Sequence, residues 1–250
     1  MFDPNDEFEL IVLTNIGPEK RSAVVIDNFY KNPDQIRQLA LTHPQITAEE
    51  DPELIGGLPG NRIYISTDEV TKKLKSIFLQ LCSELPVWKH KFDKTVFDYV
   101  WKIKNSGFTC NVVSDRTLLQ HPRGIIPHQD YYRQQNSIDE KVQFGCVIYL
   151  NTPEECKGGT SLYSYQGQMS IPVSNTYELY RTDNEDELPK SLLFEKIHNN
   201  LTQSPDWKIE KYFPMRYNRC VLYEADVLHS AVFDLGMYKD YSRINQVLFM

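Results

Sequence analysis

The spacing of the apolar residues changes near residue 96, and this change constrains the fold more than any other feature of the chain. Before it, one apolar stripe recurs at helical spacing and consists of Val70, Leu74, Ile77, Phe78 and Leu81. The stripe predicts a helix that is capped by Thr67 and packs on a sheet. After residue 96, segments rich in β-branched and aromatic residues predict strands. Helices followed by a sheet indicate a mainly β chain with flanking helices.

The first third of the chain contains further short elements. Residues 8–13 and 23–26 have the composition of strands. A helix is expected to begin at Pro33, because Asn32 is a good N-cap and proline suits the first helical position. Residues 44–62 are rich in glycine and proline, which predicts a loop.

The remaining elements are mostly strands. The segments expected to form strands are residues 96–103, 109–113, 117–120, 142–150, 209–213, 216–223, 227–232 and 242–249. Residues 142–150 are the most apolar of these, which predicts a central strand. A glycine pair at 158–159 predicts a turn into another short strand. Segment 166–206 is the least regular, and we expect it to hold one helix, within 186–199, and to cover the functional site as an insertion.

The chain shows neither a linker nor an internal repeat, so we expect one domain over residues 1–250. Residues 1–95 would supply the first strands and the supporting helices. Residues 96–250 would form the sheet core, with the insertion near 166–206.

The net charge of −7 makes nucleic acid an unlikely partner, because binding to a phosphate backbone relies on Lys and Arg. The basic cluster at residues 72–75 fits a solvated helix face better. The five cysteines are odd in number and contain no Cys-x-x-Cys pair, which indicates reduced thiols in a cytoplasmic protein. The acidic N-terminus does not resemble a signal peptide, and no apolar run is long enough for a membrane helix.

One short motif indicates a metal site. In His128-Gln129-Asp130, the histidine and the aspartate are two residues apart, so on a strand they would point to the same face. With a third ligand from His229 they would form a facial triad of two histidines and one carboxylate, which leaves coordination positions open. The motif alone is weak, although none of the other five histidines has an acidic residue at that offset. His198 is the rival third ligand, but it lies in the irregular segment.

The order of these features resembles the iron(II)- and 2-oxoglutarate-dependent oxygenases, in particular their prolyl-hydroxylase-like branch. The resemblance covers roughly residues 96–250. Its elements, in chain order, are the supporting helices, His128-x-Asp130, an apolar strand followed by Gly158-Gly159-Thr160, the distal His229, and Arg243. Within that motif the glycines and the threonine fit turn geometry better than direct contacts to a ligand.

The resemblance implies a distorted double-stranded β-helix, also called a jelly roll or cupin-like fold, with flanking helices. It implies that His128, Asp130 and His229 hold Fe(2+) and that Arg243 binds the distal carboxylate of 2-oxoglutarate. The residues agree with this role for Arg243, because an unpaired charge on an otherwise apolar closing strand would be costly. Two further residues, Tyr149 and Asn245, are weaker candidates for the co-substrate.

The reaction implied by the resemblance couples the oxidation of 2-oxoglutarate by O2, which yields succinate and CO2, to hydroxylation of an unactivated C–H bond. The substrate would be a small molecule, or an amino-acid side chain in a peptide or protein, and ascorbate would support turnover. Three residues that follow the triad directly are candidate substrate contacts: Tyr131, Tyr132 and Arg133.

Two other functions remain open at this point. The first is a catalytically silent jelly-roll module that binds metal and a ligand. The second is a zinc hydrolase that uses the same triad with a metal-bound water. The second function needs a general base near the metal and gives Arg243 no role.

Overall fold

The computed structural model describes residues 1–47, 50, 60–104, 107–130, 142–171 and 188–250. Its main element is an antiparallel seven-stranded sheet. The strands in spatial order are β1 (Glu9–Ile16), β2 (Arg21–Asp27), β8 (Cys220–Glu224), β5 (Phe144–Tyr149), β10 (Arg243–Phe249), β4 (Phe108–Val113) and β3 (Asn61–Ile65). Strand β5 is the middle strand and is fully buried, which confirms the prediction of a central strand.

A second, three-stranded antiparallel sheet faces the first. Its strands, in spatial order, are β7 (Trp207–Pro214), β6 (Gly159–Tyr165) and β9 (His229–Val232). Side chains of the large sheet, such as Val147 and Val221, share one buried cluster with Leu162 of β6 and Phe213 of β7. The two sheets therefore pack face to face around a common core.

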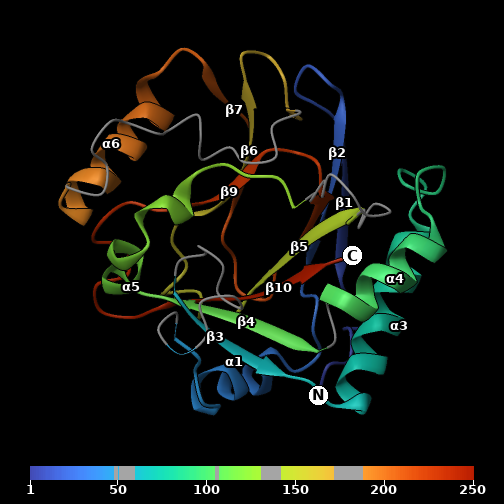
Figure 1. Cartoon of the computed structure of the whole chain (residues 1–250). Coiled ribbons are helices and arrows are strands. Elements are labelled where there is room, and N and C mark those ends of the chain that lie inside the picture. The colour runs from blue at the N-terminus through green and yellow to red at the C-terminus, as the bar shows by residue number, and fades with distance from the viewer. Residues whose placement is uncertain (48–49, 51–59, 105–106, 131–141, 172–187) are drawn as a thin grey trace.

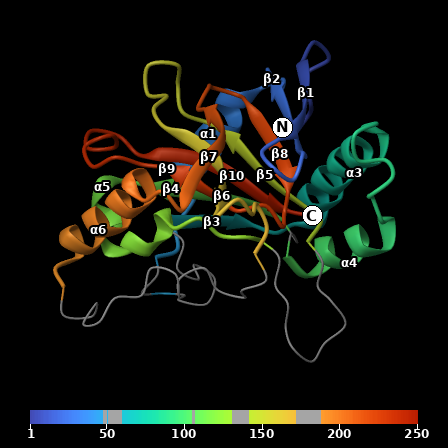
Figure 2. The ribbon, with the colours of Figure 1, turned by 90° about the horizontal axis from the view of Figure 1, so that it is seen from above.

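The helices lie on two sides of this pair of sheets (Figures 1 and 2). On the outer face of the large sheet lie α1 (Pro33–Thr42), α3 (Asp68–Glu84) and α4 (Lys94–Lys104). On the side of the small sheet lie α5 (Asp115–Gln120), the 3-10 helix η1 (Pro122–Ile125) and α6 (Lys190–Gln203). The predicted class, β sheets with flanking helices, is confirmed.

The predicted stripe forms the buried face of α3. Its residues Leu74, Ile77 and Phe78 are buried, and Thr67 caps the helix by accepting a hydrogen bond from the backbone N–H of Val70 (3.3 Å). The helix expected to begin at Pro33 is α1, and the helix expected within 186–199 is α6. Most of the predicted loop 44–62 and part of the expected insertion, residues 172–187, lie outside the described residues.

Two predicted strands are wrong. Residues 96–103 belong to helix α4, where Phe97, Val100 and Trp101 are buried at the i, i+3, i+4 spacing of a helix. Residues 117–120 belong to α5, whose first turn is held by a capping box between Ser114 and Thr117. In both segments β-branched or aromatic residues favoured a strand, and packing or capping decided for a helix.

Two predictions from composition can be compared with the structure. All five cysteines are free thiols. Among the described residues, no helix has both the length and the apolar character needed to cross a membrane.

One buried arginine of the large sheet, Arg219, is paired with a carboxylate. Arg219, just before β8, donates from Nε and Nη2 to the two carboxylate oxygens of Asp27 at the end of β2, at 2.6 and 2.7 Å. These hydrogen bonds hold the pKa of Asp27 below its usual range. This bidentate pair joins the ends of neighbouring strands.

Asp27→Asn should lower the free energy of unfolding at pH 7 by about 1–3 kcal/mol, because it leaves the Arg219 guanidinium facing a neutral group. The folded pKa of Asp27 is depressed, so its contribution is complete above its unfolded pKa and is lost as the pH falls through the folded pKa. Denaturant unfolding of both proteins should therefore show a difference that shrinks from pH 7 to pH 3. Asp6→Asn, in an exposed pair with Lys31, should change stability by less than about 0.5 kcal/mol.

Candidate metal centre

The two histidines of the predicted triad are joined through their backbones. His128 and His229 form an isolated antiparallel bridge, in which each N–H donates to the carbonyl oxygen of the other residue at 2.9 Å. His229 begins β9, and His128 follows η1 by three residues. The bridge places the two imidazole rings side by side, with centroids 4.5 Å apart.

Each imidazole is oriented by a hydrogen bond to the carbonyl two residues before it. The Nδ1 atom of His128 lies 3.1 Å from the oxygen of Ile126, and Nδ1 of His229 lies 2.8 Å from the oxygen of Val227. A carbonyl only accepts, so each Nδ1 carries the proton and each Nε2 keeps its lone pair. Hydrogen bonds of this kind are typical of histidines that bind a metal through the other nitrogen.

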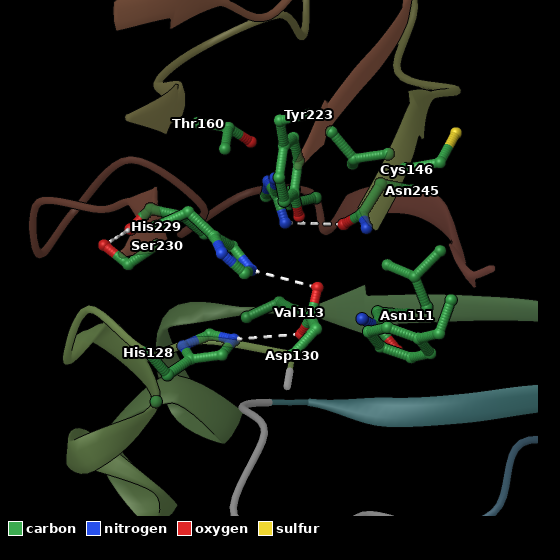
Figure 3. A pocket seen from close by; sticks show the side chains of 16 residues that line it. Asn111, Val113, His128, Asp130, Cys146, Thr160, Tyr223, His229, Ser230 and Asn245 are labelled. Atoms are coloured by element: carbon green, nitrogen blue, oxygen red, sulfur yellow. Dashed lines mark hydrogen bonds and ion pairs between the residues drawn. The ribbon is translucent and has the colours of Figure 1, made fainter. Parts of the chain in front are cut away.

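Asp130 places its carboxylate between the two Nε2 atoms (Figure 3). Its Oδ1 lies 3.9 Å from Nε2 of His128, and its Oδ2 lies 3.4 Å from Nε2 of His229. One ligand atom from each of the three residues lies within 4.8 Å of the others, so together they could hold a metal ion. The Oδ2 atom is buried and accepts no hydrogen bond.

Burial sets the protonation of the three groups. It lowers the pKa of both histidines to about 4, with the neighbouring His229 adding to the effect on His128, so both are neutral at pH 7. Burial also raises the pKa of Asp130 to about 6. A buried carboxylate with an unpartnered oxygen is costly, and a cation bound beside it would remove that cost.

The donor set fits a divalent transition metal. Two neutral imidazoles and one carboxylate on one side are the ligands used by non-haem iron(II) sites, and they also suit zinc and manganese. The unpartnered Oδ2 of Asp130 and the two free Nε2 lone pairs supply one donor atom each. The residues present therefore fit the predicted metal.

The triad opens into a cavity of about 70 Å³ between the two sheets. Strands β4 and β10 contribute its polar wall through Asn111, Arg243 and Asn245. The face of β10 that carries Arg243, Asn245 and Val247 lines the cavity.

Arg243 is a buried cation that has no carboxylate partner in the described part of the chain. Its side chain is 4% exposed, and its Nη1 donates to Oδ1 of Asn245 at 2.5 Å. Its guanidinium carbon lies 5.3 Å from the ring centre of Phe233 and 5.6 Å from that of Tyr149. Its Nε has no hydrogen-bond partner, and no carboxylate in the described part of the chain lies within 4.0 Å of it. A guanidinium in this position is suited to bind an anion.

Tyr149, residues 131–133 and His198 are the remaining residues that the sequence analysis considered for the site. The hydroxyl of Tyr149 donates to Oγ1 of Thr160 at 2.7 Å, so Tyr149 supports the cavity from behind Thr160. Burial raises the pKa of Tyr149, which therefore stays a neutral donor. The candidate substrate contacts at 131–133 lie outside the described residues. The rival ligand His198 lies away from the triad and pairs with Asp234 at 2.8 Å.

Gly145 and Tyr223 are site residues that the sequence analysis missed. They lie opposite each other on β5 and β8, and the Tyr223 ring lies 4.4 Å from that of His229. A Cβ atom on Gly145 would lie 2.5 Å from the Tyr223 ring and 2.7 Å from Oδ2 of Asp130. A glycine inside the most apolar strand was the available signal, because such a glycine often marks a close approach.

Comparison with known proteins shows a family. Residues 10–240 match the model of a family of unknown function (DUF6445). The chain belongs to this family. No curated protein matches this DUF6445 chain.

Three solved structures are similar to this DUF6445 chain at low TM-scores. The crystal structure of AAD-2 in complex with Mn(II) and N-oxalylglycine has a TM-score of 0.31 and 11% identity, over 74% of this chain and 88% of that one. A protein from Burkholderia xenovorans, described as an alpha-ketoglutarate dependent 2,4-D dioxygenase, has a TM-score of 0.29 and 8% identity, over 71% and 86%. EvdMO1 has a TM-score of 0.26 and 11% identity, over 98% and 55%. At these TM-scores the likeness carries no argument.

Asp130→Asn should abolish Mn(II) binding and raise the stability of the metal-free protein. The folded pKa of Asp130 is raised to about 6, so its ionised form opposes folding above that pH and the effect fades towards pH 4. Thermal and denaturant unfolding at pH 7.5 should show a gain of about 1–3 kcal/mol that shrinks at pH 4.5. Asp234→Asn, at an exposed carboxylate, is the control. A metal-free variant less stable than wild type would contradict this account.

Gly145→Ala should weaken Mn(II) binding by about tenfold or more while the protein stays folded, because the added methyl group displaces the Asp130 carboxylate. Isothermal titration calorimetry would measure the affinity. Ile148→Val, on the opposite face of the same strand, controls for general loosening of β5 and should leave the affinity unchanged. Equal affinity in Gly145→Ala and wild type would show that the carboxylate position is not set by this contact.

Proposed function

We propose that this chain is an iron(II)- and 2-oxoglutarate-dependent oxygenase that hydroxylates an organic substrate. The observation that carries the proposal is that one cavity is lined by both the His-Asp-His triad and the buried Arg243, for which the described residues supply no carboxylate. A metal site alone fits many reactions. A metal site that shares its cavity with a guanidinium fits a co-substrate that has a metal-binding end and an anionic end.

Different residues of the cavity would bind the metal and the co-substrate. His128, Asp130 and His229 would hold iron(II), and Arg243 would bind the distal carboxylate of 2-oxoglutarate through its planar fork. Iron(II) with 2-oxoglutarate and O2 supplies oxidation of an unactivated C–H bond, with succinate and CO2 as co-products. Asn245 holds the Arg243 guanidinium in place, and apolar side chains of β4 and β10 exclude water from the site.

The finer assignments also belong to the proposal. The two facing sheets would be the halves of a distorted double-stranded β-helix, and the chain would belong to the prolyl-hydroxylase-like branch. Tyr149 and Asn245 would support the co-substrate, and residues 131–133 would contact a substrate that is a small molecule or an amino-acid side chain. Ascorbate would support turnover, and the protein would act in the cytoplasm.

The described part of the cavity favours the oxygenase over the hydrolase. A zinc hydrolase needs a general base close to the metal-bound water. Among the described residues that line the cavity, Asp130 is the only carboxylate, and it is a ligand. The hydrolase also leaves the buried Arg243 without a role. A silent binding module would use the same residues and is separated from the oxygenase only by its products.

Anaerobic titration of the protein with iron(II) and 2-oxoglutarate should produce the weak visible charge-transfer band of a 2-oxoglutarate complex in wild type. His229→Ala should lose the band, because one of three ligands is gone. Arg243→Met should need at least about tenfold more 2-oxoglutarate, because a charge-assisted bidentate contact is lost. Arg216→Met, at an exposed arginine, should titrate like wild type.

Admission of O2 to the same samples should then release succinate from wild type. A band without succinate, across a panel of candidate substrates, would favour the silent module. No band, together with tight zinc binding, would overturn the oxygenase and favour the hydrolase.

A further inference from the structure

A second buried arginine has no carboxylate partner among the described residues. Arg62 on β3 is 8% exposed, and its Nε is buried without a hydrogen-bond partner. No carboxylate of the described residues lies within 4.0 Å of its guanidinium. Burial lowers the pKa of Arg62 to about 10, so it is still charged at pH 7. A buried charge of this kind is costly unless something pairs with it.

Other well-covered arginines of the chain do have carboxylate partners. Arg21 pairs with Glu224 and Asp226, Arg37 with Glu155, and Arg219 with Asp27. Within the described part of the chain, Arg62 and Arg243 are the buried arginines without such a partner. Arg243 faces the cavity, so the position of Arg62 relative to that cavity decides what it can bind.

The strand register places Arg62 on the cavity face of the sheet. Arg62 lies opposite Asn111 on β4, Asn111 lies opposite Asn245 on β10, and Asn245 lies opposite Tyr149 on β5. Directly opposed residues of antiparallel strands point to the same face. Asn111 and Asn245 line the cavity. Arg62 lies on the same face of the sheet, next to Asn111 on the edge strand β3.

Asn111 has an unpaired group of its own. Its Oδ1 is buried and has no hydrogen-bond partner, although the residue is only 8% exposed. A buried donor on Arg62 and a buried acceptor on Asn111 are thus both unsatisfied on neighbouring strands. Asn111 lines the cavity and Arg62 lies opposite it on the neighbouring strand, so the two unsatisfied groups are placed to bind one polar ligand.

One molecule of 2-oxoglutarate does not satisfy both arginines. Strands β3 and β10 lie on either side of β4, so their backbones are roughly 10 Å apart. In the proposed function, Arg243 takes one carboxylate of 2-oxoglutarate and the other end of that molecule faces the triad. The anion for Arg62 must therefore come from a second molecule.

We propose that Arg62 and Asn111 form the subsite that binds a carboxylate of the organic substrate, so the substrate class is a small carboxylic acid. The role of this ligand as a substrate rests on the proposed function, but the anion site itself does not. The guanidinium of Arg62 donates to the carboxylate oxygens. The amide oxygen of Asn111 accepts from a hydroxyl or ammonium group next to that carboxylate, as found in hydroxy and amino acids.

The first test uses propionate as the probe and the metal-free protein, in an Arg243→Met background that removes the other anion site. Thermal unfolding in sodium propionate and in sodium chloride at equal ionic strength should show a saturable stabilisation by propionate. Adding Arg62→Met should weaken that binding by at least about tenfold. Arg62→Lys, which keeps the charge without the fork, should weaken it less.

The stability of the ligand-free Arg62→Met protein distinguishes an anion-binding role of Arg62 from a structural role. If Arg62 serves to bind a ligand, Arg62→Met should unfold in chloride at a temperature no lower than that of its parent. The substitution removes a buried charge that has no partner in the ligand-free protein. Earlier unfolding of Arg62→Met, or propionate binding that is equal with and without Arg62, would overturn the proposal. Saturable stabilisation by inorganic phosphate but not by propionate would also overturn it, in favour of a phosphate site.

The second test measures whether the bound carboxylate lies near the metal site. With Mn(II) bound and N-oxalylglycine present, Mn(II) should broaden the proton resonances of propionate, and zinc should not. The broadening should vanish in Arg62→Met and persist in wild type. Propionate binding without broadening would place the anion outside the metal cavity and overturn its assignment to the substrate. Absence of Mn(II) binding would instead count against the proposed function, with the first test still interpretable.

Discussion

Two backbone hydrogen bonds between His128 and His229 hold the site together. They tie the segment after η1 to the first residue of β9, and so they join two parts of the chain about a hundred residues apart. The side chains on this bridge are then oriented by the carbonyls of Ile126 and Val227. Asp130 follows on the same face, with its N–H donating to the oxygen of Ala225. The arrangement of these three residues is therefore set mainly by hydrogen bonds to the main chain.

The cavity and the adjoining face of the large sheet carry charges that the protein does not pair within its described residues. Asp130 has an unpartnered carboxylate oxygen, and Arg62 and Arg243 have unpartnered guanidinium nitrogens. Each costs folding free energy in the ligand-free protein. The paired arginines elsewhere show that the chain can supply carboxylates where only stability is at stake. Unpaired charged groups at and beside a cavity are typical of a site whose partners are ligands, as in other proteins that give up stability for function.

The two segments wrongly predicted as strands, 96–103 and 117–120, became helices for specific reasons. Residues 96–103 contain valine, isoleucine and aromatic residues, which favour a strand. In the structure, however, Trp101 stacks on both Phe97 and Phe78 of α3. That contact pairs two helices and involves residues that are distant in sequence, so composition could not predict it. The capping box at Ser114 and Thr117 was a local signal for α5 that could have been read from the sequence. A close approach at Gly145 could also have been predicted from the sequence, although only the fold shows that Asp130 occupies the space beside it.

The sequence by itself determined the α3 stripe, the central apolar strand and the alternation that turns Arg243 and Asn245 to one face, because these follow from local periodicity. It also predicted which three residues could meet as ligands. Only the tertiary structure decided that they do meet, that Arg243 lies beside them with no carboxylate partner among the described residues, and that Arg62 lies on the same face of the sheet as Asn111 and Asn245. Those facts depend on strand register and on the packing of two sheets, and register joins residues that no local pattern connects.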